Sequence, residues 1–545
     1  MNKTTFSLYI TGIILLTVSG CLKFTHKRTL INEVVSQEKL HKIEPLKLPK
    51  TQVQTHPVID INEISANILK LTLPQCRAMA LQNNLELQAT LINPSMAAER
   101  ITQERAIFEA TFSAGASINK TDRPFVRTES RIQGTKGENK GLSLGLSKPL
   151  ITGGTASFNL SDNINETDAI GSRFNPNYGS NAKFSLTQPL LRNAGAHTLT
   201  QAIRLAGYQR QITDAQTKLA ILSILANLDK TYWRLYAARK ELDVRKQQYH
   251  LAQTQLEQAQ RLVNSGDRAQ IEILRAQAGI AERLESIIIA QNNLYNRQRE
   301  LKRIINHKDL NMQSPVMITP LTKPIPQHYS IDHNHLVQSA LKNRMEILVL
   351  EIQVLEDMDT IKLRKNQKLP LINFTYNYNL NAFGSSRDNS YDMLTHSRFA
   401  NHYLGLNAHI PLGNNAAKSR LRQAIMQRIQ RLSTKKNREN LIKLEVLNAA
   451  DKLLGNLQRI QASQQNTIVA AKLYEAEKRQ YNQDQRTSTD VLNAQTNLAN
   501  AQLSELSALV EYQIALVDLA HATGTLMGAA NIQWTPLNPV SKRYR

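Results

Sequence analysis

Few side chains in this chain could do chemistry. It contains two cysteines, Cys21 and Cys76, in 545 residues. His328, His333 and His335 lie in a proline-bounded linker, but no cysteine or carboxylate pattern accompanies them, so a surface role is favoured over a metal site. The sequence has neither a glycine-rich phosphate loop nor a serine nucleophile elbow. We therefore predict no catalytic residue, no metal and no cofactor.

Cys21 follows a short apolar stretch that is typical of an export signal. The apolar run of residues 6–18, about 13 long, is too short for a membrane span of about 20 residues. The small residues Ser19-Gly20 directly before Cys21 resemble the lipobox of bacterial lipoproteins. This resemblance implies a lipoprotein signal peptide over 1–20 and a thiol acylated with palmitate. Because Leu22 follows rather than Asp, it also implies delivery to the outer membrane. An ordinary signal peptide with an incidental cysteine is the alternative.

The segment after the cysteine is polar, and we interpret residues 21–71 as a lipidated tether. Three prolines prevent a long helix there: Pro45, Pro49 and Pro57. Acylation of Cys21 would leave Cys76 without a partner for an intramolecular disulfide, so Cys76 is expected to pack in a helix. The formal net charge of +23 does not indicate nucleic acid, because the Lys and Arg are dispersed along helices without interleaved aromatic residues. Solvated helix faces or anionic lipid headgroups account for this charge better.

The elements that must position any site are two long helical hairpins. The first spans residues 199–305 and turns at Asn264-Ser265-Gly266-Asp267, and its first arm of about 65 residues should reach roughly 100 Å. Apolar residues on both arms keep the spacing of a left-handed coiled coil. The turn sequence SGDRAQIEILRAQ is echoed by DQRTSTDVLNAQ, and ALQNNLEL, which begins at Ala80, is echoed by ALKNRMEI, which begins at Ala340. The chain is therefore an internal duplication.

The predicted boundaries follow from this duplication. The first repeat covers 72–310, with strands at about 111–188 and the hairpin at 199–305. A linker covers 311–330. The second repeat covers 331–528, with strands at about 371–411 and a hairpin at 416–527, and a tail covers 529–545.

Both strand regions alternate apolar with small or polar residues. Strands of about 9 to 11 residues with this pattern are typical of a closed membrane barrel, and a half-buried sheet in a soluble domain is the alternative. The offset between the halves falls from 260 at Ala80 and Ala340 to 222 at Pro189 and Pro411, so the first half carries 38 extra residues in its strand region. We expect an additional hairpin that turns at residues 151–154, and six strands per chain.

The duplicated halves, the strand-ending segment Gln188–Gly195, and Asp490–Gln495 at the second hairpin turn resemble the TolC-like outer membrane efflux proteins. The likeness covers about residues 72–528. It implies a homotrimer whose long helical hairpins form a helical barrel in the periplasm, continuous with a transmembrane antiparallel β-barrel. It also implies an exit duct for efflux or type I secretion, opened by a periplasmic adaptor and an inner-membrane pump. A periplasmic coiled-coil scaffold lipoprotein is the alternative.

The resemblance also implies a gate at the hairpin turns. By position, the family's gate residues correspond to Glu272, Tyr481, Arg486, Asp490 and Asn493. Two of them depart from the family pattern, since Glu272 replaces an Asp and Asn493 replaces a second acidic ring. The alternative is that Glu272 and Asp490 only occupy the first turn of a helix, where the dipole favours a carboxylate.

Overall fold

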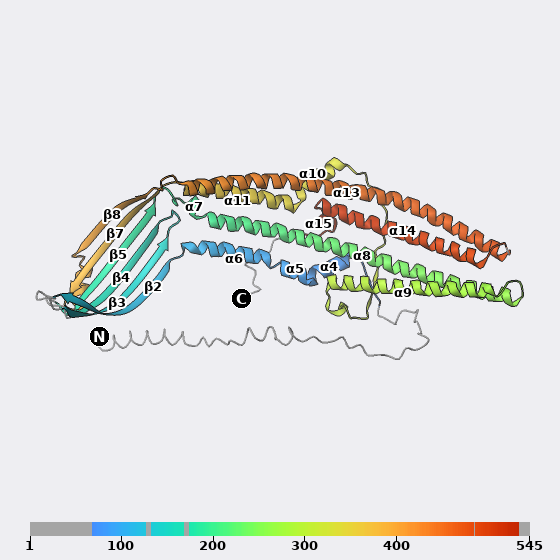
Figure 1. Cartoon of the computed structure of the whole chain (residues 1–545), viewed down its shortest axis with the longest axis horizontal. Coiled ribbons are helices and arrows are strands. Elements are labelled where there is room, and N and C mark those ends of the chain that lie inside the picture. Colours follow the sequence, from blue (N-terminus) through green and yellow to red (C-terminus); the bar gives the residue numbers. More distant parts are fainter. Residues whose placement is uncertain (1–67, 127–131, 168–173, 484, 534–545) are drawn as a thin grey trace, which may run out of the picture. The chain divides into compact units, whose positions relative to one another are not determined.

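The computed structural model describes residues 68–126, 132–167, 174–483 and 485–533, all within one compact unit, Ser65–Arg545. Cys21, the predicted signal peptide and most of the predicted tether lie outside the described residues. In this unit an antiparallel sheet lies at one end of a set of long helices (Figure 1). No described helix combines the length and the apolar character that crossing a membrane requires.

In the described part of the chain the sheet has six strands in the order β2-β3-β4-β5-β7-β8, as predicted. β8, with 10 residues, has the expected length of 9 to 11, whereas the other strands, with 13 to 18 residues, are longer. Several extend past the apolar positions into polar residues at the end remote from the helices. Their bounds are β2 Thr111–Val126, β3 Ile132–Pro149, β4 Thr155–Thr167, β5 Asn177–Pro189, β7 Leu371–Gly384 and β8 Ala400–His409.

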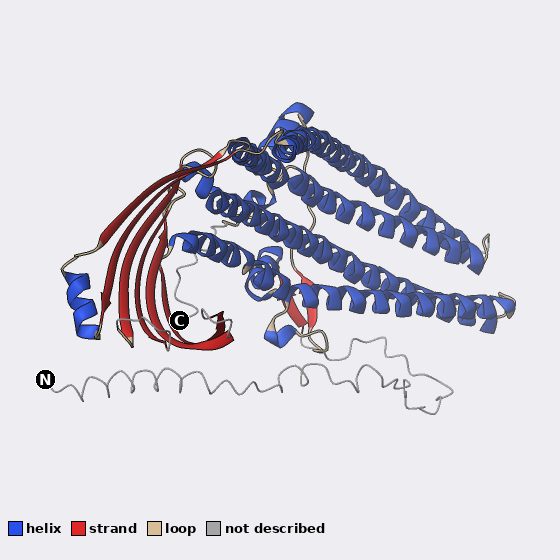
Figure 2. Ribbon diagram, turned by 60° about the vertical axis from the view of Figure 1, so that its left-hand side comes forward, coloured by secondary structure: helices blue, strands red, loops and turns tan. Residues whose placement is uncertain are grey.

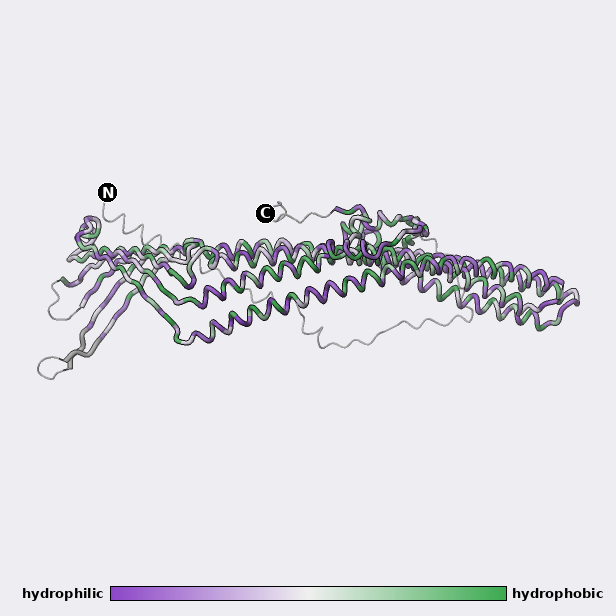
Figure 3. The backbone as a smooth tube through the Cα atoms, turned by 90° about the horizontal axis from the view of Figure 1, so that it is seen from above, coloured by the Kyte–Doolittle hydropathy of each residue, from purple (hydrophilic) through white to green (hydrophobic). Residues whose placement is uncertain are grey.

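The register gives the sheet one apolar and one polar face, visible as alternating colours along the strands in Figure 3. Phe158 of β4 pairs with Leu146 and Phe184, whereas its neighbour Ser157 pairs with Ser147 and Ser185. Successive side chains of a strand point to opposite faces, so each pairing continues one face across the sheet. Many apolar side chains remain exposed: Phe112, Ile118, Leu142, Leu146, Leu404 and Leu406 are about half exposed or more.

The additional hairpin is β3 and β4, joined by a tight turn over residues 150–154. The Leu150 N–H donates to the Gly154 carbonyl at 2.7 Å, and Gly153 has a φ of +100° that favours glycine. The predicted hairpin and its turn are confirmed.

A short helix, α12 (Arg387–Thr395), lies between β7 and β8. The Gly, Ser and Asn residues of Gly384–Asn389 predict a surface loop there, and this prediction is partly wrong because α12 begins within that segment. Ser386 caps this helix by accepting from the Asn389 N–H. Asp162 of β4 accepts from Tyr391 and pairs with Arg387 at 3.2 Å, which holds α12 against the sheet. Figure 2 shows this short helix at the end of the strands remote from the long helices.

Two helical hairpins make up most of the remaining chain. The first is α8 (Gln201–Asn264) with α9 (Ile271–Ile305), and the second is α13 (Asn415–Asn482) with α14 (Ser488–Ala522). Shorter helices continue the shorter arms: α6 and α9 both pack along α8, and α11 and α14 both pack along α13. The shorter helices are α4 Leu73–Asn83, α5 Leu85–Thr90, α6 Asn93–Arg105, α7 Ala196–Leu199, α10 His333–Asn343, α11 Met345–Gln367 and α15 Leu526–Ala529.

Two segments were predicted without regular structure and have it. Residues Ile68–Leu71, in the predicted tether, form β1, which pairs in parallel with β6 (Met317–Pro320) of the predicted linker. His333 and His335 lie in the first turn of α10, which Asp332 caps, and not in a linker. Within the described residues, no group of three or more His, Cys, Asp or Glu side chains could hold a metal ion.

The core lies where the helices of both halves meet. Leu87, Leu225, Val517 and Leu526 form one buried cluster there. Cys76 is fully buried on α4, as expected, and burial raises the pKa of its thiol to about 12. Nearby, Arg77 pairs with the fully buried Asp229 at 2.6 Å, which compensates the buried carboxylate.

Candidate functional site

The two hairpin turns lie at the same end of the helices, remote from the sheet (Figure 1). The first turn joins α8 to α9 and the second joins α13 to α14. All five residues of the predicted gate lie in or beside these turns.

Glu272 links the two hairpins. It lies in the first turn of α9 and is only 5% exposed. Its Oε2 accepts from the backbone N–H of Ser488, the first residue of α14, at 3.1 Å, and its Oε1 accepts from Arg275 at 2.7 Å. The first N–H groups of a helix have no partner within that helix, and its dipole favours an anion there. Glu272 therefore caps the helix of the other hairpin, in addition to lying in the first turn of its own.

Arg268 is a residue that the sequence reasoning missed. It belongs to the first turn, and its guanidinium carbon lies 5.2 Å from the ring centroid of Tyr481, which is fully buried. Its Nη2 donates to the carbonyl oxygens of Tyr481 and Arg486, both at 3.4 Å. The last carbonyl groups of a helix favour a cation, and a cation over an aromatic face is attracted by the ring. The signal in the sequence was a basic residue directly after Gly266-Asp267.

Arg486 contacts its own hairpin. Its Nε lies 3.2 Å from Glu477 Oε2 and donates to Gln480 Oε1 at 3.0 Å, both near the end of α13. The Arg486 side chain thereby holds the second turn in place. The backbone carbonyl oxygen of Arg486 accepts a hydrogen bond from Arg268.

Asp490 closes a capping box at the start of α14. Its Oδ2 accepts from the Thr487 N–H at 2.9 Å and from the Thr487 hydroxyl at 2.8 Å. These hydrogen bonds, first from the Thr487 backbone and then from its side chain, lower the pKa of the Asp490 carboxyl, and the charge of Arg486 adds to them. Asn493 is exposed on the next turn of α14. The structure thus shows two separate contacts between the hairpins, Glu272 with Ser488 and Arg268 with Tyr481 and Arg486, and it uses Asp490 as a helix cap.

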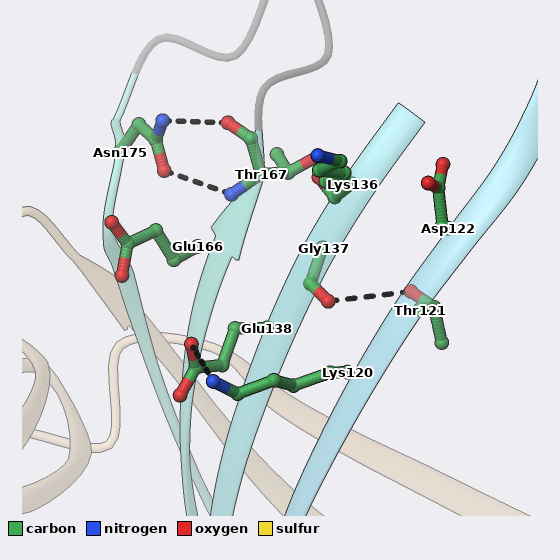
Figure 4. Close-up of a pocket in the computed structure, with 9 residues that line it drawn as sticks. All are labelled: Lys120, Thr121, Asp122, Lys136, Gly137, Glu138, Glu166, Thr167 and Asn175. Carbon is green, nitrogen blue, oxygen red and sulfur yellow. Dashed lines mark hydrogen bonds and ion pairs between the residues drawn. The ribbon is translucent and has the colours of Figure 1, made fainter. Parts of the chain in front are cut away.

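An open pocket of about 520 Å³ lies at the opposite end of the unit, among the ends of β2, β3 and β4 (Figure 4). Glu138 pairs with Lys120 at 3.5 Å and with Lys140 at 3.1 Å. The side chain of Asn175 bonds the backbone of Thr167. The charged side chains that line the pocket are of both signs, so the pocket does not favour a ligand of one charge.

Comparisons with known proteins agree with this architecture. The family described as "Outer membrane efflux protein" matches residues 77–307 and 336–525. Outer membrane protein TolC of Salmonella enteritidis is 23% identical over 358 residues, 64% of this chain and 69% of that protein. TolC of Vibrio cholerae serotype O1 is 21% identical over 315 residues, 57% of this chain and 70% of that protein.

Solved structures share the fold. The outer-membrane channel OprN has a TM-score of 0.62 at 13% identity, over 83% of this chain and 90% of that one. The MtrE outer membrane channel of Neisseria gonorrhoeae, solved in an open state, has a TM-score of 0.57 at 15% identity, over 89% of this chain and 98% of that one.

Proposed function

The chain belongs to the outer membrane efflux protein family, and from that premise we propose that it is the passive exit duct of a tripartite efflux or type I secretion system. It is an outer membrane efflux channel that extends into the periplasm. One observation carries the proposal: a sheet whose apolar residues are gathered on one face continues into two hairpins whose turns meet at the far end.

Three copies would complete the duct. Within the described strands, β2 and β8 each have one unpaired edge, and lipid requires that such edges be closed. Three six-stranded sheets would give eighteen strands, in the range of about 16 to 18 at which barrels leave an aqueous channel. The helices support the same assembly, because exposed apolar residues form a stripe on α13 that needs a partner: Ile425, Met426, Ile429 and Leu432. This exposed apolar surface favours the duct over a scaffold with soluble strands.

The hairpin turns would be the gate, and a periplasmic adaptor with an inner-membrane pump would open it. Hydrogen bonds to charged groups contribute roughly 1.5–3 kcal/mol each. Closure would therefore be a sum of a few modest contacts, repeated in three protomers, which a docking partner can reverse. Hydrogen bonds between the two hairpins support this role: Glu272 accepts from Ser488, and Arg268 donates to Tyr481 and Arg486.

Single-channel conductance of the purified protein in lipid bilayers tests the proposal. We expect Arg268→Ser combined with Arg486→Ser to raise conductance severalfold. The first turn then loses its hydrogen bonds to the second hairpin, and the second turn loses its contacts with the end of α13. Asp490→Asn should weaken block by multivalent cations. Arg261→Ser is the matched control, because Arg261 is exposed in the last turn of α8. Unchanged conductance in the double variant would show that the turns are only helix ends, and absence of any channel would reject the duct.

We also propose that Cys21 carries the lipid that its sequence context implies. A single acyl chain gives marginal anchoring, so the sheet would supply most of the membrane attachment. Cys21→Ala should abolish palmitate labelling in cells while some assembled trimer remains, as read on a non-denaturing gel. Labelling that persists in this variant would reject acylation of Cys21.

A further inference from the structure

The polar face of the sheet, as far as its side chains are described, is almost free of charge. Asn, Ser, Thr and Gly dominate it on all six strands. Among the described side chains of this face, Lys183 is the only Lys, Arg, Asp or Glu, and His409 at the helix-proximal end is its only imidazole. A single lysine in so uniform a surface stands out.

Lys183 occupies a central position. It is the middle residue of β5, which is itself an inner strand, and it pairs with Asn159 on one side and Asn379 on the other. Its neighbour Phe184 faces the opposite, apolar side, where it pairs with Phe158 and Tyr378. A charge at mid-height of a membrane strand is costly on the lipid side, whereas on the lumen side it tunes selectivity. Lys183 therefore belongs to the water-filled side.

The surroundings leave this charge uncompensated. No ion pair in the described part of the chain involves Lys183, which is half-buried. Along β5 its same-face neighbours are engaged with β7: Asn181 donates to Asn381 at 2.7 Å and Ser185 donates to Asn377 at 2.5 Å. These amide and hydroxyl groups bond to one another, so the lining around the lysine stays neutral.

We propose that Lys183 determines the charge selectivity of the barrel lumen and favours anionic solutes there. The inference rests on the proposed trimeric duct, in which three copies form a ring of lysines at mid-height. Rings of basic side chains are a general device for anion pores. An eighteen-stranded barrel has a radius of about 18 Å, from a strand spacing of about 4.8 Å and a tilt of about 40°. The Debye length is about 30 Å at 0.01 M salt and about 3 Å at 1 M, so the preference should be strong only in dilute salt.

Reversal potentials in bilayers test this inference. Recordings of the full-length trimer across a KCl gradient near 0.01 M should show that Lys183→Gln lowers the chloride-to-potassium permeability ratio at least about twofold. Lys183→Glu should lower it further, and both differences should vanish near 1 M. The same series in the Arg268→Ser, Arg486→Ser background should show a larger change, because the periplasmic end then limits the current less.

Lys148→Gln and Lys148→Glu are the matched controls. Lys148 lies on β3 and is exposed on the opposite face of the sheet. Its substitution by Gln therefore removes the same charge outside the lumen. A change at Lys183 without one at Lys148 supports the inference. Conducting channels with the same ratio in all Lys183 variants, or an equal change in the Lys148 variants, would overturn it. A wild-type protein that forms no channel would instead reject the duct on which it rests.

Discussion

At the scale of single residues, the hairpin turns are held by charges that contact backbone groups of the other hairpin. Glu272 accepts from the first N–H of α14, and Arg268 donates to carbonyl groups at the end of α13 and in the turn after it. Each charge lies where the helix dipole favours it. This arrangement ties the two halves of one chain together without requiring an acidic residue at position 493, where this sequence has Asn.

The capping box at α14 should make the second turn sensitive to acid. Thr487→Ala is expected to cost about 0.5–2 kcal/mol of local stability, the usual cost of losing such a cap. The pKa of Asp490 is lowered in the folded state, so its contribution is fully present above the ordinary Asp pKa of about 3.9 and is lost as the pH falls through the lowered value. Hydrogen exchange of the first α14 amides measures this opening.

We therefore expect wild type and Asp490→Asn to differ in that exchange near neutral pH and to converge at strongly acidic pH. Ser504→Ala, at an exposed site of the same helix, should match the wild type throughout. A difference between wild type and Asp490→Asn that stayed constant with pH would contradict the assignment.

At the scale of elements, the β3–β4 turn is a tight contact between sheet and helices. Besides its positive φ, Gly153 has no room for a side chain, because a Cβ there would lie 2.3 Å from the Asn193 carbonyl oxygen. In the same turn, the carbonyl oxygen of Thr152 accepts a hydrogen bond from the Gly195 N–H. The additional hairpin is thus locked onto the segment that leads into α8.

Gly153→Ala should lower the temperature at which the assembled protein changes its migration on a gel. Gly195→Ala is a close control, since Gly195 also has a positive φ, +93°, but no atom lies within 4 Å of its added Cβ. Both substitutions carry a backbone cost of about 1–3 kcal/mol. Only Gly153→Ala adds the clash, so an equal loss of heat resistance in both would show that close packing at the turn is unimportant.

At the scale of the whole molecule, one chain leaves apolar surface that its own elements do not cover. Ile425, Ile429 and Leu432 lie at spacings of four and three along α13 and are 40–59% exposed. Such a stripe is typical of a helix that packs against a neighbour. The unpaired edges of β2 and β8 need a partner as well, and copies of the same chain related by a rotation would cover both in one closed ring.

Ile429→Glu should therefore shift the purified protein from trimer toward monomer in light scattering after gel filtration. The substitution removes roughly 1.5–3 kcal/mol of apolar burial from each interface and places a charge there. Gln430→Glu introduces the same charge one residue further along α13, at an exposed site, and should leave the assembly intact. If both variants assembled equally, the α13 stripe would not be the protomer contact.

The sequence alone determined the duplication, both hairpins with their turns, the six strands and the additional hairpin. These features depend on short-range causes: periodicity selects helix or strand, and Gly153 and Gly266 permit turns where they stand. A capping box at the start of α4 has a local cause as well: Thr72 and Gln75 stand three residues apart in the sequence, and the Thr72 N–H donates to Gln75 Oε1 at 2.9 Å. The count of six strands follows from the 38 extra residues in the strand region of the first half.

Only the tertiary structure decided which distant groups meet. Glu272 and Ser488 are 216 residues apart, Arg268 reaches Tyr481, Asp162 holds α12, and β1 pairs with β6. None of these contacts follows from a periodic pattern, because each depends on how helices and strands from two repeats are aligned in space. For the same reason, the sequence alone does not show that Lys183 has no described charged neighbour on its face of the sheet. Alternation places a lysine on the polar side of its own strand, but only the register across six strands shows that no described carboxylate shares that face.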